Sequence, residues 1–270
     1  GLSSATNTQQ LFELYYAYLN QNGETQEGFL DFSKWGQTLL QDINEIDRYL
    51  IDPVKLFSNL SAIQEINHWY LAAEKTKMVE DYIEFWNTLE KLYETFNQRL
   101  LKQGIGHQGL IYRKAHEQLE SYLRANKNNR YIFIGFNALN TAESKIIQSI
   151  LKSQDADIYW DADSYYLDDP VHDAGYFIRH HKKNWPYLQN NPLQGISSCF
   201  LQKKNIQIVG VPKNISQVKY VGSLLKALNS ENSELLKRTA VILSDETLLN
   251  PLLHSIPSEI EKVNVTMGYP

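Results

Sequence analysis

Two carboxylates, Asp161 and Asp163, stand two residues apart directly after the apolar run Asp157-Ile158-Tyr159-Trp160. Oxygen ligands at this spacing can both reach a divalent cation when the backbone turns between them. The alternative is a junction between a loop and a helix, capped by Asp168 or Asp169, because acidic side chains are favoured at helix starts. We favour the junction and keep the metal site as the weaker interpretation.

Other short motifs lack the structural context that their chemistry needs. The glycine pattern of 104–109 has the form G-x-G-x-x-G, but a helical pattern precedes it where a dinucleotide site needs a strand, so we predict a loop. Glu143 and Lys145 have the E-x-K spacing of a nuclease superfamily, but they lie on a predicted helix and are interpreted as solvated charges. Asp245-Glu246 follows an apolar run and fits either a Mg²⁺ pair or a helix start.

Several catalytic patterns are missing from the sequence. It contains neither a G-x-x-x-x-G-K-[ST] phosphate loop nor a G-x-S-x-G nucleophile turn. The histidines are scattered apart from His180-His181, and Cys199 has no base nearby in the sequence. We therefore expect no catalytic residue and no cofactor in this chain.

Composition narrows the class of protein. The chain has 270 residues, a formal net charge of −5 and one cysteine, which excludes an internal disulfide framework. A nucleic-acid role would need a local basic patch. Apolar runs are shorter than a membrane span, so we predict no membrane association and a cytoplasmic setting.

The elements that must position these residues change in type along the chain. Helical periodicity runs from residue 8 to about 125 and includes patterns over 79–101 and 110–123. After the polar stretch 126–129, apolar runs alternate with helical patterns, which predicts α/β with a largely parallel sheet. The predicted strands are 131–136, 157–160, 205–211, 239–244 and 263–267, and the predicted helices are 141–153, 172–182, 215–228 and 246–254.

We predict three parts: a helical accessory region over 1–128, an α/β part over 129–200, and the start of a second α/β part over 201–270. The segment 184–200 is predicted to be an irregular connection. The chain starts without Met and stops directly after a strand-like run, so we expect a segment of a longer protein.

The order of these parts and the sequences of four short segments resemble superfamily 1 helicases, from the middle of the first motor domain into the second. The resemblance is closest to the inactivated helicase-like half of AddB-type proteins that carry a PD-(D/E)XK nuclease domain. The four segments are Phe133–Asn140, Tyr159–Tyr166, Ala174–Arg179 and Val263–Pro270.

This resemblance implies layers like those of P-loop helicase domains and a role in DNA repair or recombination. It places Gly135-Phe136-Asn137 where an active helicase has its Asp-Glu pair, which implies an inactivated ATPase. The phosphate loop would lie before Gly1 and the nuclease residues after Pro270. Implied partners are single-stranded DNA and a helicase–nuclease subunit.

The expected DNA contacts combine cations with aromatic rings. Solvated charges and core aromatics remain the ordinary alternative for each residue. The candidates are Arg113, Arg130, Arg179, His180, Lys182 and Lys183 for the backbone, with Trp185 or Tyr187 for base stacking. Two other functions stay open: a metal-dependent nucleotide-sugar transferase that uses Asp161 and Asp163, and a protein-interaction scaffold.

Overall fold

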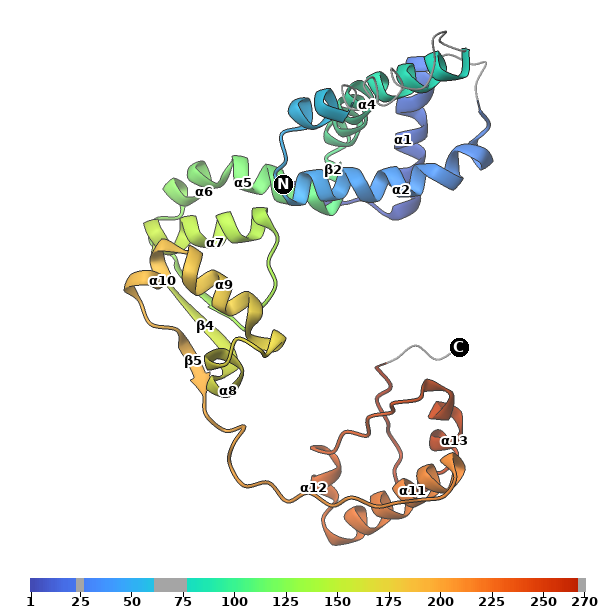
Figure 1. Cartoon of the computed structure of the whole chain (residues 1–270), viewed down its shortest axis with the longest axis vertical. Helices are drawn as coiled ribbons and strands as arrows, with labels where there is room; N and C mark the ends of the chain where they lie inside the picture. Colours follow the sequence, from blue (N-terminus) through green and yellow to red (C-terminus); the bar gives the residue numbers. More distant parts are fainter. Residues whose placement is uncertain (23–26, 61–76, 267–270) are drawn as a thin grey trace. The chain divides into compact units, whose positions relative to one another are not determined.

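The computed structural model describes residues 1–22, 27–60 and 77–266. The chain divides into two compact units, Gly1–Gln202 and Lys203–Pro270 (Figure 1). The first unit holds a helical part and a small parallel sheet, and the second unit starts close to residue 201, where the sequence predicts the last of its three parts.

The first part of the chain is helical, as predicted. The single helix predicted over 110–123 is interrupted at Gln118. The interruption turns the next helix so that Leu119 and Leu123 pack on Ile150 of the following α/β part. Strand β1 (Ser3–Ser4) pairs in parallel with β2 (Ile105–Gly106). The helices are α1 (Asn7–Asn22), α2 (Phe29–Arg48), a helical stretch at 53–60, α4 (Lys77–Lys102), α5 (Gln108–Glu117) and α6 (Leu119–Ala125).

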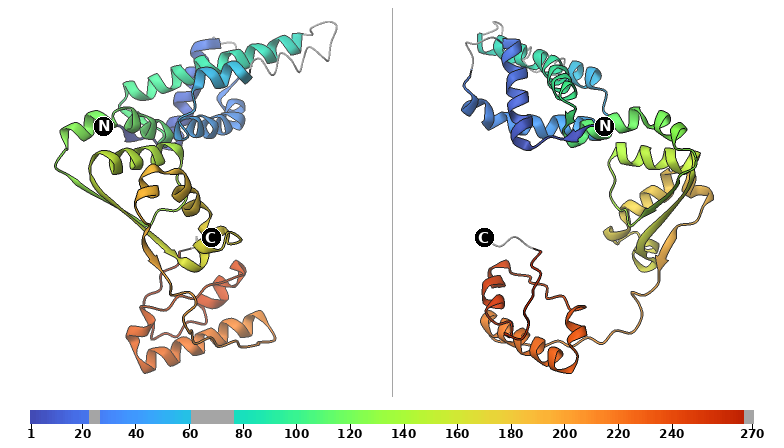
Figure 2. Two further views of the ribbon diagram at one scale, coloured as in Figure 1. Left: turned by 60° about the vertical axis from the view of Figure 1, so that its left-hand side comes forward. Right: turned by 180° about the vertical axis from the view of Figure 1, so that it is seen from behind.

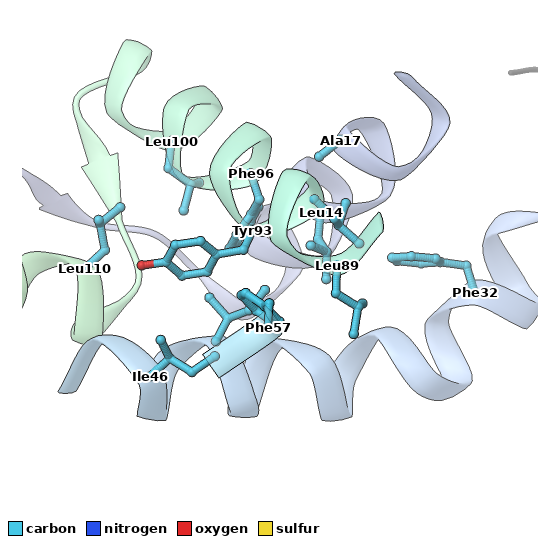
Figure 3. Close-up of a cluster of buried hydrophobic side chains, with 12 residues drawn as sticks. Leu14, Ala17, Phe32, Ile46, Phe57, Leu89, Tyr93, Phe96, Leu100 and Leu110 are labelled. Carbon is cyan, nitrogen blue, oxygen red and sulfur yellow. The ribbon is translucent and has the colours of Figure 1, made fainter. Parts of the chain in front are cut away.

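One apolar cluster holds these helices together (Figure 3). Phe32, Phe96 and Leu14 are fully buried in it, and burial of each such side chain is worth about 1.5–3 kcal/mol. Tyr93 belongs to the same cluster, but its hydroxyl reaches a polar site at the edge of this core.

The α/β part contains three parallel strands in the order β3-β4-β5. Strands β3 (Arg130–Ile134) and β4 (Asp155–Asp163) confirm the runs predicted at 131–136 and 157–160. The prediction of an irregular connection over 184–200 is wrong, because this segment holds helix α10 (Pro186–Asn190) and strand β5 (Gln194–Ser197). Gly195, at φ +77°, interrupts the apolar alternation of β5, and a Cβ there would meet the backbone of Trp160.

Helices cover one face of this sheet (Figures 1 and 2). Buried residues from α7, α9 and α10 pack on Ile158 and Trp160 of β4. The helices between the strands are α7 (Thr141–Ser153), α8 (Ser164–Asp168), the 3-10 turn η1 (Asp173–Gly175) and α9 (Tyr176–Asn184). The helix predicted at 141–153 is thereby confirmed, and the one predicted at 172–182 corresponds to η1 and α9.

The opposite face of the sheet is bare in the described part of the first unit. Ile132 and Tyr159 are exposed there, and Ile134 is 70% exposed. Parallel sheets are normally covered on both faces, so this layer is half of a usual α/β architecture.

The second unit contains the helices predicted at 215–228 and 246–254, as α11 (Asn214–Glu231) and as the 3-10 turn η2 (Glu246–Leu248) with α13 (Leu249–Leu253). A short helix that was not predicted, α12 (Ser233–Leu236), follows α11. The unit's predicted strands at 205–211 and 239–244 are wrong, as is the described portion of 263–267 (Met267 lies outside the described residues). The runs are present but unpaired and unburied, with Ile208 92% and Ile242 90% exposed.

Taken together, helices and a small parallel sheet make the chain a mixed α/β protein. No helix within 1–22, 27–60 or 77–266 is long and apolar enough to cross a membrane.

Candidate functional site

In open parallel sheets, ligands bind at the carboxyl ends of the strands. Strand β3 ends at Gly135-Phe136-Asn137, which brings no carboxylate to this edge. Gly135 adopts φ +73°, a left-handed conformation that favours glycine, and its N–H donates to the Tyr159 carbonyl at 3.0 Å. The backbone bends there without placing a metal-binding side chain.

Asp163, at the end of β4, is already occupied by hydrogen bonds. Its Oδ2 accepts from the Ser197 hydroxyl at 2.8 Å and from the N–H groups of Cys199 and Phe200 at 2.7 and 3.0 Å. Its Oδ1 accepts from the Tyr165 N–H at 3.1 Å, which caps α8. Desolvation acts to raise the pKa of Asp163, but the hydrogen bond from Ser197 and those from the backbone outweigh it and lower the pKa.

This bonding makes Asp163 a connector between β4 and the segment after β5. Asp161 is exposed and contributes no second ligand to a cluster. Across the described ranges, no group of three or more His, Cys, Asp or Glu side chains is arranged to hold a metal ion. The geometry therefore favours the loop-to-helix junction over a cation site.

An aromatic cluster lies beside this edge. The Tyr165 ring stacks on Phe200, with centroids 4.5 Å apart, and contacts His172 at 4.7 Å. A shallow depression of about 500 Å³ borders the cluster, lined by Ser164, Tyr165, Asp168, Asp169, Pro170 and Leu201. Its two carboxylates repel phosphate, so this depression does not suit a nucleotide.

Three of the predicted DNA-contacting cations bind other groups of the protein. Arg179 donates to the carbonyls of Tyr166 at 2.6 Å and His172 at 2.7 Å, with longer bonds to two carbonyls between them. Arg130 pairs with Asp157 at 2.8 Å on the bare face of the sheet. These bonds fix the loop before α9 and the start of β3.

Arg113 is the third engaged cation. Its Nε donates to Asp47 at 2.6 Å, and its terminal nitrogen reaches the carbonyls of Ile46 and Ile51. Asp47 is fully buried and also accepts from the Tyr93 hydroxyl at 2.5 Å, while His107 Nε2 lies 3.3 Å away. Burial raises the pKa of Asp47, but hydrogen bonds from His107 and Tyr93 and the charge of Arg113 outweigh it and lower the pKa.

The network around Asp47 joins α2, α4 and α5, and sequence inspection missed it. His107 Nδ1 accepts from the Leu110 N–H, which caps α5 and leaves the ring proton on Nε2. Gly109 lies so close to the Asn44 carbonyl that no Cβ would fit. The glycine pattern at 104–109 is thus packed against α2, and no phosphate can approach the start of α5.

Two further motifs are local helix caps. Glu143 and Asn140 form a reciprocal capping box at the start of α7, with bonds of 2.9 and 3.0 Å. Asp245 caps η2 by accepting from the Thr247 N–H at 3.0 Å. Neither carboxylate is placed as a metal ligand.

The predicted stacking residues lie against the core. Trp185 is buried, with its ring centroid 4.8 Å from that of His181 and 6.0 Å from that of Trp160. Tyr187 is half-buried on the same cluster. Both rings pack on neighbouring side chains of the protein.

The remaining candidates, His180, Lys182 and Lys183, share the exposed side of α9. No carboxylate of the described residues lies within ion-pair distance of either lysine. Arg113 and Arg179 thus bind groups of the fold, Arg130 forms an exposed ion pair, and His180, Lys182 and Lys183 lie together on one helix where a ligand can reach them.

No protein-family model matches the chain, and no curated protein matches it. The resemblance to helicase-like proteins therefore stays a prediction.

Proposed function

We propose that this chain is a non-catalytic, helicase-like segment of a DNA repair or recombination helicase–nuclease. In this role it serves as a scaffold for a motor or nuclease partner and contacts single-stranded DNA. The four sequence segments that resemble superfamily 1 helicases motivate the proposal. The supporting observation is a parallel-sheet edge with no carboxylate at Gly135-Phe136-Asn137, beside helix α9, whose Lys182 and Lys183 form no ion pair among the described residues.

The absence of carboxylates at Gly135-Phe136-Asn137 argues against nucleotide hydrolysis, because Mg²⁺ in phosphoryl-transfer sites is held by acidic side chains. Asp163 cannot replace them, since Ser197 and the backbone of Cys199 and Phe200 already occupy its Oδ2. The segment then contributes binding surface and architecture.

The DNA contact follows from electrostatics. A phosphate backbone is attracted by cations whose charge is not neutralised by a carboxylate. Arg113 and Arg130 face Asp47 and Asp157, whereas Lys182 and Lys183 extend from the last turn of α9 into solvent. With an overall charge of −5, binding must be local to this patch.

Fluorescence anisotropy with a labelled poly-dT oligonucleotide at low salt tests the DNA contact. We expect the Lys182→Glu/Lys183→Glu variant to lose about tenfold or more in affinity, and its salt dependence to fall by about 0.7 per lost phosphate contact. The matched control is Lys91→Glu/Lys102→Glu, which changes the same charge on two exposed lysines of α4.

Two results would remove the DNA contact. One is the absence of binding at micromolar protein, and the other is binding that does not respond to salt or that weakens equally in both variants. Either would leave the protein-interaction scaffold as the remaining function.

A further inference from the structure

Helix α9 carries an exposed aromatic ring in line with its basic residues. Tyr176, the first residue of α9, is 55% exposed. Its ring stacks on that of His180, with centroids 6.4 Å apart and planes inclined by 25°. Residues three and four apart share a helix face, so Tyr176, His180 and Lys183 form one outward stripe.

Burial on the other side of α9 fixes the direction of this stripe. Ile178 and His181 are buried under the sheet, and His181 Nε2 donates to the Asn137 carbonyl at 2.9 Å. Arg179 anchors the first turn to the preceding loop through carbonyls of residues 166–172. Because the helix is held at several points, a ligand that binds the stripe orders little additional structure.

We propose that Tyr176 is the base-stacking residue of the single-stranded DNA interface, with His180 supporting its ring and Lys183 contacting a backbone phosphate. This inference rests on the proposed function. From Tyr176 to Lys183 the helix rises by about 10 Å, so the ring and the ammonium group can contact different parts of one bound strand.

Charge along α9 sets the orientation of the strand. Asp169 and Asp173 precede the helix and repel phosphates, whereas Lys182 and Lys183 lie at its other end. The uncharged face of a base therefore meets Tyr176, and the backbone runs past the lysines. Sequence inspection chose Trp185 and Tyr187 for stacking, but those rings pack into the core beneath.

The test compares two labelled oligonucleotides of equal length, poly-dT and an abasic strand, by anisotropy with the 270-residue chain. Tyr176→Ala should weaken poly-dT binding by at least about five-fold and leave abasic binding unchanged, because only poly-dT has bases to stack. Tyr176→Phe, which keeps the ring, should bind poly-dT like the unchanged protein. Tyr122→Ala is the matched control, since Tyr122 of α6 is 52% exposed and lies outside the patch.

Each outcome decides the stacking role. Base-dependent loss in Tyr176→Ala, with Tyr176→Phe and Tyr122→Ala intact, supports it. If poly-dT binds and only Lys182→Glu/Lys183→Glu weakens it, the DNA contact stands and the stacking role is overturned. If neither oligonucleotide binds, the proposed function fails and the stacking role fails with it.

Discussion

The two units contain the same pattern of apolar runs and helices, but among the described residues only the first unit forms a sheet. In the first unit, the runs within Arg130–Ile134 and Asp155–Asp163 pair in parallel on either side of the α7 connection. In the second unit, the runs at 205–211 and 239–244 flank α11 in the same order and stay unpaired. A period-two apolar run is therefore not sufficient for a strand.

The difference lies in what the helices cover. In the first unit, Ile178, Trp185 and Leu188 bring a buried layer onto Trp160. In the second unit, the buried side of α11 is used elsewhere, since Gly222 lies against the Ser255 carbonyl after α13. Without a helical layer, pairing the second set of runs would gain too little apolar burial to offset the backbone entropy.

Hydrogen exchange of backbone amides tests whether the apolar runs of the two units are paired, and the difference in exchange rate should be the largest of the predicted effects. Amides of 157–160, in the central strand β4, should exchange at least about a thousandfold more slowly than those of 206–209 and 240–243, because protection in a packed sheet approaches the global stability. Mass spectrometry of peptic fragments provides the measurement. Equal protection in both sets would mean that the runs of the second unit pair in solution.

Removal of a buried side chain should sharpen the contrast. Trp160→Ala should lower the free energy of unfolding by about 3–5 kcal/mol, because a large buried ring is lost from the sheet core. Ile242→Ala, at a 90% exposed position of the second unit, should change it by less than about 0.5 kcal/mol. Urea denaturation followed by circular dichroism gives both values, and similar costs would contradict the difference between the units.

The two faces of the sheet offer the same comparison within one unit. Ile158 is buried on the covered face and Ile134 is exposed on the bare one. Ile158→Ala should cost about 2–5 kcal/mol, and Ile134→Ala less than about 1 kcal/mol. Denaturation curves of the two variants decide the point. A large cost at Ile134 would show that the bare face is covered in solution.

Local signals explain what the sequence predicted well. The apolar stripe predicts helix α7 correctly, whereas Glu143, which is interpreted from the sequence as a solvated charge, lies in the capping box with Asn140. The first two strands were found because their alternation is strong. Strand β5 was missed because Gly195 breaks a short run whose register depends on β4.

Long-range contacts explain what the sequence could not show about the candidate site. Asp47 and Tyr93 lie 46 positions apart, and a lone carboxylate in a helix looks like a surface residue. Arg179 is assigned from the sequence to a DNA contact, but the structure shows it bound to backbone carbonyls. Every residue has a backbone carbonyl, so residue types in the sequence do not reveal such a partner. The exposed placement of Lys182 and Lys183 was predictable, since lysine is rarely buried.

A pH titration should give the smallest effect and, through His181, report on how α9 is held to the sheet of the first unit. Burial lowers the pKa of His181 below its ordinary value of 6.5, and the neutral ring donates to the Asn137 carbonyl. The unfolded chain therefore binds a proton more readily than the folded one. Stability is fully present above pH 6.5 and falls as the pH drops below it.

Tryptophan fluorescence during urea denaturation isolates this effect, because all five tryptophans precede residue 203: Trp35, Trp69, Trp86, Trp160 and Trp185. The unchanged protein should lose stability between about pH 7 and pH 5. His181→Gln keeps an amide donor for the Asn137 carbonyl and should flatten this slope. Some slope will remain, since burial also lowers the pKa of His116. An unchanged slope in His181→Gln would mean that the His181 ring is solvated and binds its proton equally well in the folded and unfolded chain, and that α9 is held to the end of β3 by packing alone.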